Sequence, residues 1–156
     1  PPSPGVACSF ALESPVLLIW RSDEAKHTSE YIDHPEWKMN ITRAGDSAVD
    51  RLSSKNWDTT AWNALLQESQ AFGRVSKMLE EPSRQSMLAN VQSVLNELEL
   101  QATTRARLCM LGTSCVLLPS KANQPLDEED LKQISNRLES MNLDSILTSI
   151  APQRIV

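Results

Sequence analysis

Hydrophobic residues recur at helical spacing in several separate stretches of the chain. Between Trp62 and Leu79 they fall every three or four positions, while polar residues take the other side. Asp58 precedes this stretch as an N-cap, and residues 59–61 form the first turn. The pattern predicts a long amphipathic helix that buries its hydrophobic stripe against other helices.

A second stripe, from Met87 to Leu98, is the most regular in the chain. Pro82 is expected to end the preceding helix, and Ser83 is expected to cap this one. The sequence therefore predicts two consecutive helices with a short connection between them.

The stretch from Thr104 to Leu118 is hydrophobic on nearly all sides when it is drawn as a helix. A helix of this kind is usually central in its bundle. Gly112 in its middle indicates close packing or a break. On this helix Cys109 and Cys115 point in different directions, so they are not expected to form a disulfide.

The clearest helix start lies at Asp127, which acts as the N-cap. Acidic residues follow it and suit the positive end of the helix dipole. Hydrophobic residues then repeat at helical spacing from Leu131 to Met141. Asn142 is predicted to cap a last short helix over residues 143–150.

Residues 16–20 form the most hydrophobic run, Val-Leu-Leu-Ile-Trp. They fit a short buried strand or the first turn of a helix, and Pro15 favours a helix that continues to His27. So much hydrophobic surface must dock, either on the helices of this chain or on another protein. The residues proposed for partner binding are Leu17, Leu18, Ile19, Trp20 and Trp37.

The stretch from Tyr31 to Asp46 is predicted to be a loop, because Pro35 and Gly45 interrupt it. Ser47 is then expected to cap a short amphipathic segment over residues 48–52. Little of the chain shows the strict alternation that is typical of strands.

Together these elements predict an all-α fold, an irregular bundle of about five to seven helices. Residues 1–14 are expected to form a flexible or extended leader, and residues 15–156 a single helical domain. The expected core residues are Trp62, Leu65, Leu66, Val91, Leu95, Leu98, Leu108, Leu111, Leu131, Ile134 and Leu138.

Composition narrows the functional classes. The 156 residues carry 15 basic and 20 acidic side chains, a net charge of −5, which disfavours a nucleic-acid binder that depends on overall positive charge. No hydrophobic run is long enough to span a membrane. Cys8, Cys109 and Cys115 are an odd number without a CxxC pair, which indicates reduced structural thiols and an intracellular protein.

Candidate chemistry is sparse, and a non-enzymatic protein without metal or cofactor is expected. His27 and His34 have acidic neighbours, but their spacing matches no standard metal site. The sequence contains neither a glycine-rich phosphate loop nor a nucleophile elbow. An enzyme that takes its acid and base from residues 27–36 is the rival hypothesis, and a helical nucleic-acid binder that uses scattered arginines is a third.

The long helical stretch also resembles a known family. The residues that carry the resemblance are Asp58, Ala61, Trp62, Leu65, Glu68 and Gln70. Their pattern is similar to the first helix of a HAT (half-a-TPR) repeat, as found in the large scaffold subunit of the cleavage stimulation factor family. The resemblance covers residues 56–81, and no second repeat follows.

A second resemblance covers Ser93 to Met141, and the residues that carry it are Leu95, Leu98, Thr104, Leu108, Gly112, Asp127, Leu131 and Leu138. Their pattern is similar to the helical N-terminal domain of TFIIS-type elongation factors. Both families are helical docking modules. The resemblances therefore imply a protein–protein interaction module in a nuclear RNA-processing or transcription assembly. Its partner is expected to be another protein or a second copy of the chain, and direct contact with nucleic acid is not expected.

Overall fold

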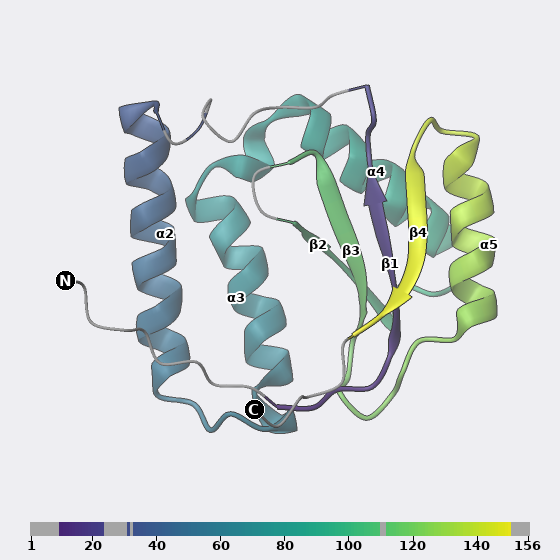
Figure 1. Ribbon diagram of the computed structural model, residues 1–156, viewed down its shortest axis with the longest axis horizontal. Coiled ribbons are helices and arrows are strands. Elements are labelled where there is room, and N and C mark those ends of the chain that lie inside the picture. Colours follow the sequence, from purple (N-terminus) through teal and green to yellow (C-terminus); the bar gives the residue numbers. More distant parts are fainter. Residues whose placement is uncertain (1–9, 24–30, 32, 110–111, 151–156) are drawn as a thin grey trace.

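The computed structural model describes residues 10–23, 31, 33–109 and 112–150. Within these ranges the chain forms four α-helices and a four-stranded sheet (Figure 1). The fold is therefore α+β, and the prediction of an all-α bundle of five to seven helices is wrong.

The sheet is antiparallel throughout, with the strand order β2-β3-β1-β4. The central strands β1 and β3 come from distant parts of the chain, and the hairpin β2–β3 supplies one edge. The strands are β1 (Pro15–Trp20), β2 (Thr104–Leu108), β3 (Ser114–Pro119) and β4 (Asp144–Ser149).

The helices divide into a covering pair and an inserted pair. Helix α4 precedes β2, and α5 connects β3 to β4, so the strands and these two helices form the βαββαβ arrangement of split-βαβ, or ferredoxin-like, folds. Helices α2 and α3 are inserted between β1 and α4 and stand together on the left in Figure 1. The helices are α2 (Pro35–Ser53), α3 (Trp62–Val75), α4 (Pro82–Glu97) and α5 (Glu128–Glu139), with 3₁₀ turns η1 (Thr59–Ala61) and η2 (Met78–Glu80).

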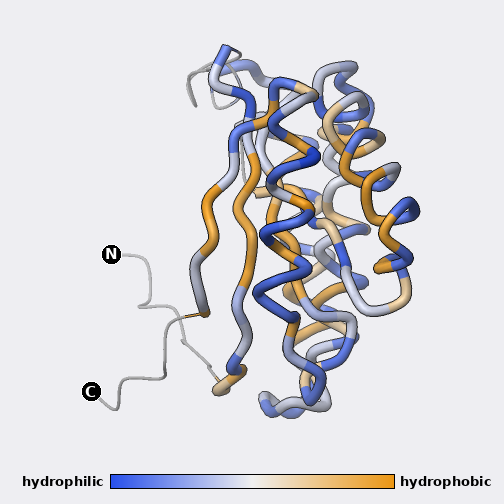
Figure 2. The backbone as a smooth tube through the Cα atoms, turned by 90° about the vertical axis from the view of Figure 1, so that its right-hand side faces the viewer, coloured by the Kyte–Doolittle hydropathy of each residue, from blue (hydrophilic) through white to orange (hydrophobic). Residues whose placement is uncertain are grey.

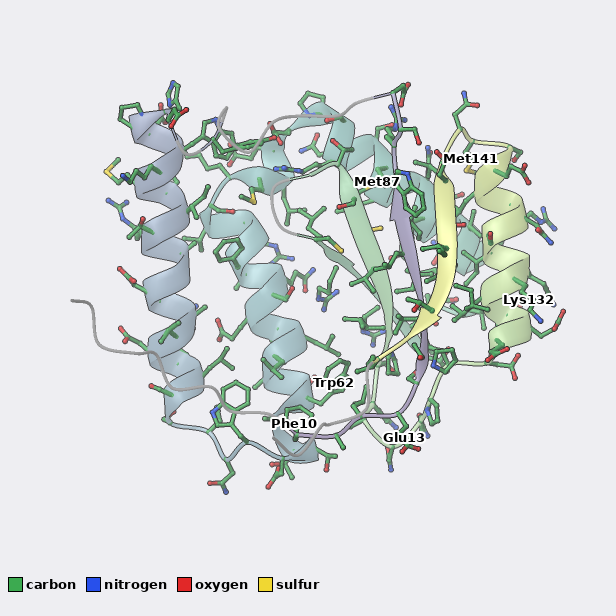
Figure 3. The ribbon with its side chains drawn as sticks, viewed as in Figure 1. Phe10, Glu13, Trp62, Met87, Lys132 and Met141 are labelled. Carbon is green, nitrogen blue, oxygen red and sulfur yellow. The ribbon has the colours of Figure 1, made fainter. Side chains whose placement is uncertain are left out.

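The core lies between one face of the sheet and the helices α4 and α5. Met87 of α4 is fully buried in it (Figure 3). In Figure 2, α5 is the helix nearest the viewer, and both hydrophilic and hydrophobic residues occur along its turns. Its buried residues Leu131, Ile134 and Leu138 recur every three or four positions, so one side of the helix packs on the core and the other faces solvent. Neither α2 nor α3 contributes to this cluster. Its members are Leu17, Ile19, Met87, Val91, Val94, Leu95, Cys115, Leu117, Leu126, Leu131, Ile134, Leu138 and Leu143.

The hydrophobic run at residues 16–20 is the central strand β1, so the preference for a helix there is wrong. Side chains alternate between the two faces of a strand. Leu17 and Ile19 point into the core and are 1% and 0% exposed, while Leu18 and Trp20 lie on the opposite face and are partly exposed. The two faces together make the run look continuously hydrophobic.

The helix predicted for residues 104–118 is the hairpin β2–β3, and the short helix predicted for residues 143–150 is β4. Residues 114–119 alternate strictly between partly exposed and buried positions. Hydrophobic side chains on both faces of a strand are spread around all sides of a helical projection, which explains the error. Cys115 faces the core beside Leu108 of β2, so the two cysteines do not share a helix.

Two helix boundaries also differ from the prediction. The expected loop at residues 31–46 and the short segment after it belong mostly to α2, which begins with Pro35 at its first position. Likewise, Pro82 does not end α3 but begins α4. Helix α3 ends earlier, at Val75, shortly before Lys77 adopts a left-handed conformation.

Several local predictions are confirmed. Asp58 accepts a hydrogen bond from the backbone of Thr60, and Asp127 accepts two at the start of α5. Leu111 lies outside the described residues. Of the other expected core residues, Leu66, Val91, Leu95, Leu131, Ile134 and Leu138 are buried, and Trp62, Leu65, Leu98 and Leu108 are partly buried.

Candidate docking surface

The sheet has a second face, opposite α4 and α5, which we call the outer face. Strand pairing arranges its side chains in rows across the sheet, one of which runs Arg107, Val116, Leu18 and Ile146. Ile146 is 53% exposed. The outer face comprises Val16, Leu18, Trp20, Arg105, Arg107, Ser114, Val116, Leu118, Asp144, Ile146 and Thr148.

Described helices leave most of the outer face free. Helices α4 and α5 contact the strands from the core side, and α2 contacts no strand. Helix α3 contacts the sheet along β2 and at Pro119, the last residue of β3. Partly exposed aliphatic side chains therefore lie at the centre of the sheet, at Leu18 of β1 and at Val116 and Leu118 of β3. Contiguous hydrophobic surface of this kind marks interaction sites more often than isolated exposed residues do.

Helix α3 borders the outer face along β2. Arg107 donates from Nε to the carbonyl oxygen of Leu66 at 2.8 Å, which holds the middle of the helix to the strand. At the beginning of α3, the indole of Trp62 donates to the carbonyl oxygen of Pro119 at 2.8 Å (Figure 3). These two bonds fix a helical border at one side of the hydrophobic surface.

Four cationic side chains line this border, and we call them the basic ridge: Arg74, Arg105, Arg107 and Lys121. Arg105 and Arg107 share the outer face of β2, Arg74 lies in the last turn of α3, and Lys121 follows β3. The ion pairs formed within the described part of the chain include none of the four. The basic ridge therefore carries positive charge that no neighbouring carboxylate neutralises.

The pKa of Arg107 reflects its burial and the positive charges around it, which no nearby carboxylate of the described residues neutralises. Burial, and after it the positive charges of Arg105 and Arg74, lower the pKa of its guanidinium. Arg107 still donates to the carbonyl oxygens of Leu66 and Ala106. The site thus holds mutually repelling cations in place with neutral acceptors, and an anionic ligand would reduce that repulsion.

An open pocket of about 430 Å³ lies at one end of the basic ridge, between the beginning of α3 and the loops that flank β2 and β3. Arg105 and Lys121 both line it, and no carboxylate does. Arg105 is oriented there by bonds from Nη1 to the carbonyl oxygens of Gln101, at 2.7 Å, and Thr104, at 3.0 Å. The remaining lining residues are Thr59, Thr60, Trp62, Asn63, Ala102, Ser120, Ala122 and Asn123.

Another charged cluster surrounds Arg84, but it is structural. The Arg84 side chain is fully buried and pairs with Glu81 at 2.6 Å. It also donates to the hydroxyl of Tyr31 at 3.1 Å and to the carbonyl oxygen of Gly112 at 3.3 Å. These contacts join the beginning of α4 to the segment before α2 and to the β2–β3 turn, and the buried arginine presents no surface to a ligand.

The five residues proposed for partner binding do not form one surface. Leu17 and Ile19 belong to the core, whereas Leu18 and Trp20 lie on the outer face. Trp37, on α2, packs edge-on against Tyr31 with the ring centres 5.3 Å apart. Because α2 contacts no strand, Trp37 is separate from the sheet surface.

Sequence reasoning missed most of the outer face because it treated the second half of the chain as helical. From the sequence, Arg105 and Arg107, together with Arg84 and Lys121, are the nearest approach to a basic patch but are too sparse to favour nucleic-acid binding, and Val116 and Ile146 take helical positions. The alternation Arg105-Ala-Arg107-Leu was the available signal, because it places both arginines on one face of a strand.

The two histidines considered for a metal or acid–base site are only partly described. His34 lies exposed at the N-cap of α2, and His27 lies outside the described residues. No group of three potential metal ligands occurs in the described part of the chain. Among the helices described, none is both long and hydrophobic enough to cross a lipid bilayer.

Comparison with protein-family models, curated proteins and solved structures produced no match. The resemblances to HAT repeats and to TFIIS-type domains therefore stay predictions.

Proposed function

We propose that this protein is a non-enzymatic interaction module that binds another protein through the outer face of its sheet. The observation that carries the proposal is the group of aliphatic side chains on β1, β3 and β4 of that face, which no described helix covers. Leu18, Val116, Leu118 and Ile146 offer a partner hydrophobic contacts that water cannot replace.

The chemistry of this surface favours protein over nucleic acid. Four-stranded sheets that bind single-stranded RNA stack the bases on aromatic side chains of their strands. Here the central strands present aliphatic side chains at the corresponding middle positions, and Trp20, at the end of β1, is the single aromatic residue of the outer face. The net charge of −5 further weakens general attraction to a phosphate backbone.

The wider setting remains part of the proposal. The sequence resemblances suggest a nuclear RNA-processing or transcription assembly, in which a module of this kind would act as a scaffold piece. A second copy of the chain is the alternative partner. Sedimentation of the purified protein over a range of concentrations distinguishes self-association from binding to a different protein.

The proposal is tested by selecting ligands from a random-peptide display library against the whole chain. Peptides that bind the unchanged protein should lose binding to Ile146→Asp, because a carboxylate on the outer face disrupts a hydrophobic contact. Val49→Asp is the matched control, since Val49 is 64% exposed on α2, away from the sheet. Equal loss in both variants, or in neither, would contradict docking on the outer face.

A further inference from the structure

The charge of the basic ridge indicates which kind of partner the outer face would bind. The inference drawn from it rests on the proposed function, that the outer face is a docking surface. We infer that the outer face binds a segment that combines aliphatic side chains with acidic ones, the acidic side chains lying along Arg74, Arg105, Arg107 and Lys121. The aliphatic residues would contact Leu118, Val116 and neighbouring positions of the sheet.

The first argument is charge complementarity. The protein has more acidic than basic residues, yet the four cations of the ridge are not among the ion pairs that its described residues form. Other surface cations, such as Arg51 and Lys132, do have carboxylate neighbours, at 2.7 and 3.2 Å. A ligand carboxylate would supply the charge that the ridge lacks.

The second argument is the geometry of the arginines. Arg105 and Arg107 point to the same face because they are two residues apart on one strand. Each is held by Nη1 against backbone carbonyl oxygens, and Arg107 also by Nε. In both residues these bonds leave Nη2 available. Arginines that are already oriented lose less side-chain entropy when they bind a carboxylate.

The third argument is continuity between the charged and hydrophobic parts of the surface. Arg105 pairs with Leu118, and Arg107 pairs with Val116 across the β2–β3 hairpin. Each arginine is therefore the direct neighbour of an aliphatic side chain on the same face. A peptide in which acidic and aliphatic residues are neighbours matches this arrangement better than either kind of residue alone.

The experiment uses a peptide from the library selection, synthesised in two forms, one with its acidic residues and one with the corresponding amides. Binding to the whole chain is measured by isothermal titration calorimetry at low and high sodium chloride concentration. The acidic form should bind about threefold to tenfold more tightly for each carboxylate that meets the ridge, with the difference reduced at high salt.

The protein variants separate charge from folding. Arg74→Gln with Lys121→Gln changes two exposed side chains and should reduce the preference for the acidic peptide, and Arg107→Gln should reduce it further. Lys132→Gln is the control, because Lys132 lies on α5, which packs on the core side of the sheet (Figure 3). Far-UV circular dichroism and the melting temperature show whether each variant keeps its fold.

The possible results distinguish the two proposals. If Ile146→Asp abolishes binding but the acidic and amide peptides bind equally, the ridge has no role and the docking function stands. If no selected peptide depends on Ile146, both proposals fail. A single-stranded oligothymidylate that binds more tightly than the peptides, and that depends on Trp20 and Arg107, would overturn the acidic-peptide inference in favour of nucleic acid.

Discussion

Cys115 illustrates how one position on a strand determines the chemistry of a side chain. It is fully buried on the core side of β3, where burial raises the pKa of its thiol to about 12. Cys109, directly after β2, is partly exposed, and burial raises the pKa of its thiol as well. Both thiols therefore stay protonated at neutral pH, and neither has the properties of a catalytic nucleophile.

We predict that Cys115 is unreactive toward iodoacetamide at pH 8 until the protein unfolds. A thiol with the ordinary pKa of 9.0 is about one-tenth ionised at that pH, whereas a pKa of about 12 leaves roughly one thiolate in ten thousand. Peptide mapping by mass spectrometry, with and without urea, measures the difference. Rapid labelling of Cys115 in the native protein would contradict its burial.

The same shift predicts how stability depends on pH. Below pH 9 the Cys115 thiol is neutral in both the folded and the unfolded chain. Between pH 9 and 12 only the unfolded chain loses the proton readily, so the contribution of this residue to stability falls as the pH rises.

Glu99 is a residue whose backbone conformation does not suit its type. It follows α4 with a φ of 58°, in a helix-ending motif where the amide of Leu100 donates to the carbonyl oxygen of Leu95 at 2.8 Å. We predict that Glu99→Gly raises the free energy of unfolding by about 0.5–1 kcal/mol, because glycine adopts this conformation without strain. Urea unfolding measures the change.

A matched substitution controls for this effect. Asn142 has nearly the same φ, 57°, after α5, but asparagine tolerates the left-handed region better than glutamate does. Asn142→Gly should therefore stabilise the protein less than Glu99→Gly. If Glu99→Gly instead lowers the free energy of unfolding, the Glu99 side chain stabilises the fold by more than its left-handed backbone conformation destabilises it.

At the scale of elements, the helices were easier to predict than the strands, for a physical reason. Asp127 and the acids after it specify the start of α5 locally, through capping and the helix dipole. The strand β1 is defined by its neighbours, since its backbone bonds go to β3 and β4, far away in the sequence. A short hydrophobic run contains no information about those partners.

The outer face was unpredictable for the same reason. Its rows combine residues from four strands, and Val116 lies beside Leu18 only because β3 pairs with β1. The composition around residues 104–118 did suggest an important hydrophobic element. However, the spacing of the hydrophobic residues along the sequence has to distinguish a buried helix from a pair of strands with hydrophobic side chains on both faces, and here it does not. Gly112 lies just before β3 and not inside a helix.

The Arg84 cluster connects elements, so its removal should weaken the molecule as a whole. We predict that Arg84→Met lowers the free energy of unfolding by about 3–5 kcal/mol, because it removes the cation that pairs with the largely buried Glu81 carboxylate. The hydroxyl of Tyr31, which also donates to that carboxylate, carries no charge to replace it. Combining it with Glu81→Leu should cost less than the sum of the two single changes, as measured by urea unfolding. Additive losses would indicate that the pair does not interact energetically.

At the scale of the whole molecule, the βαββαβ unit carries the hydrophobic core, and α2 and α3 are an addition to it. The core cluster contains residues of β1, β3, α4 and α5 and the loops beside them, but none from the inserted pair. The inserted helices bury a separate, smaller set of side chains, which includes Ala44 and Leu66. Arg51 of α2 also pairs with Glu68 of α3.

We therefore predict that replacing residues 33–80 with a short glycine–serine linker leaves the four-stranded sheet folded. The core of α4, α5 and the sheet keeps all its members, while the bonds from Trp62 and Arg107 to their partners are lost. The shortened chain should unfold cooperatively at a lower melting temperature and retain dispersed amide signals in a nitrogen–proton correlation spectrum. A flexible glycine–serine linker imposes no fixed conformation on the residues that it joins. If the shortened chain shows no cooperative transition, the loss of the inserted helices is therefore the cause, and these helices are required for folding.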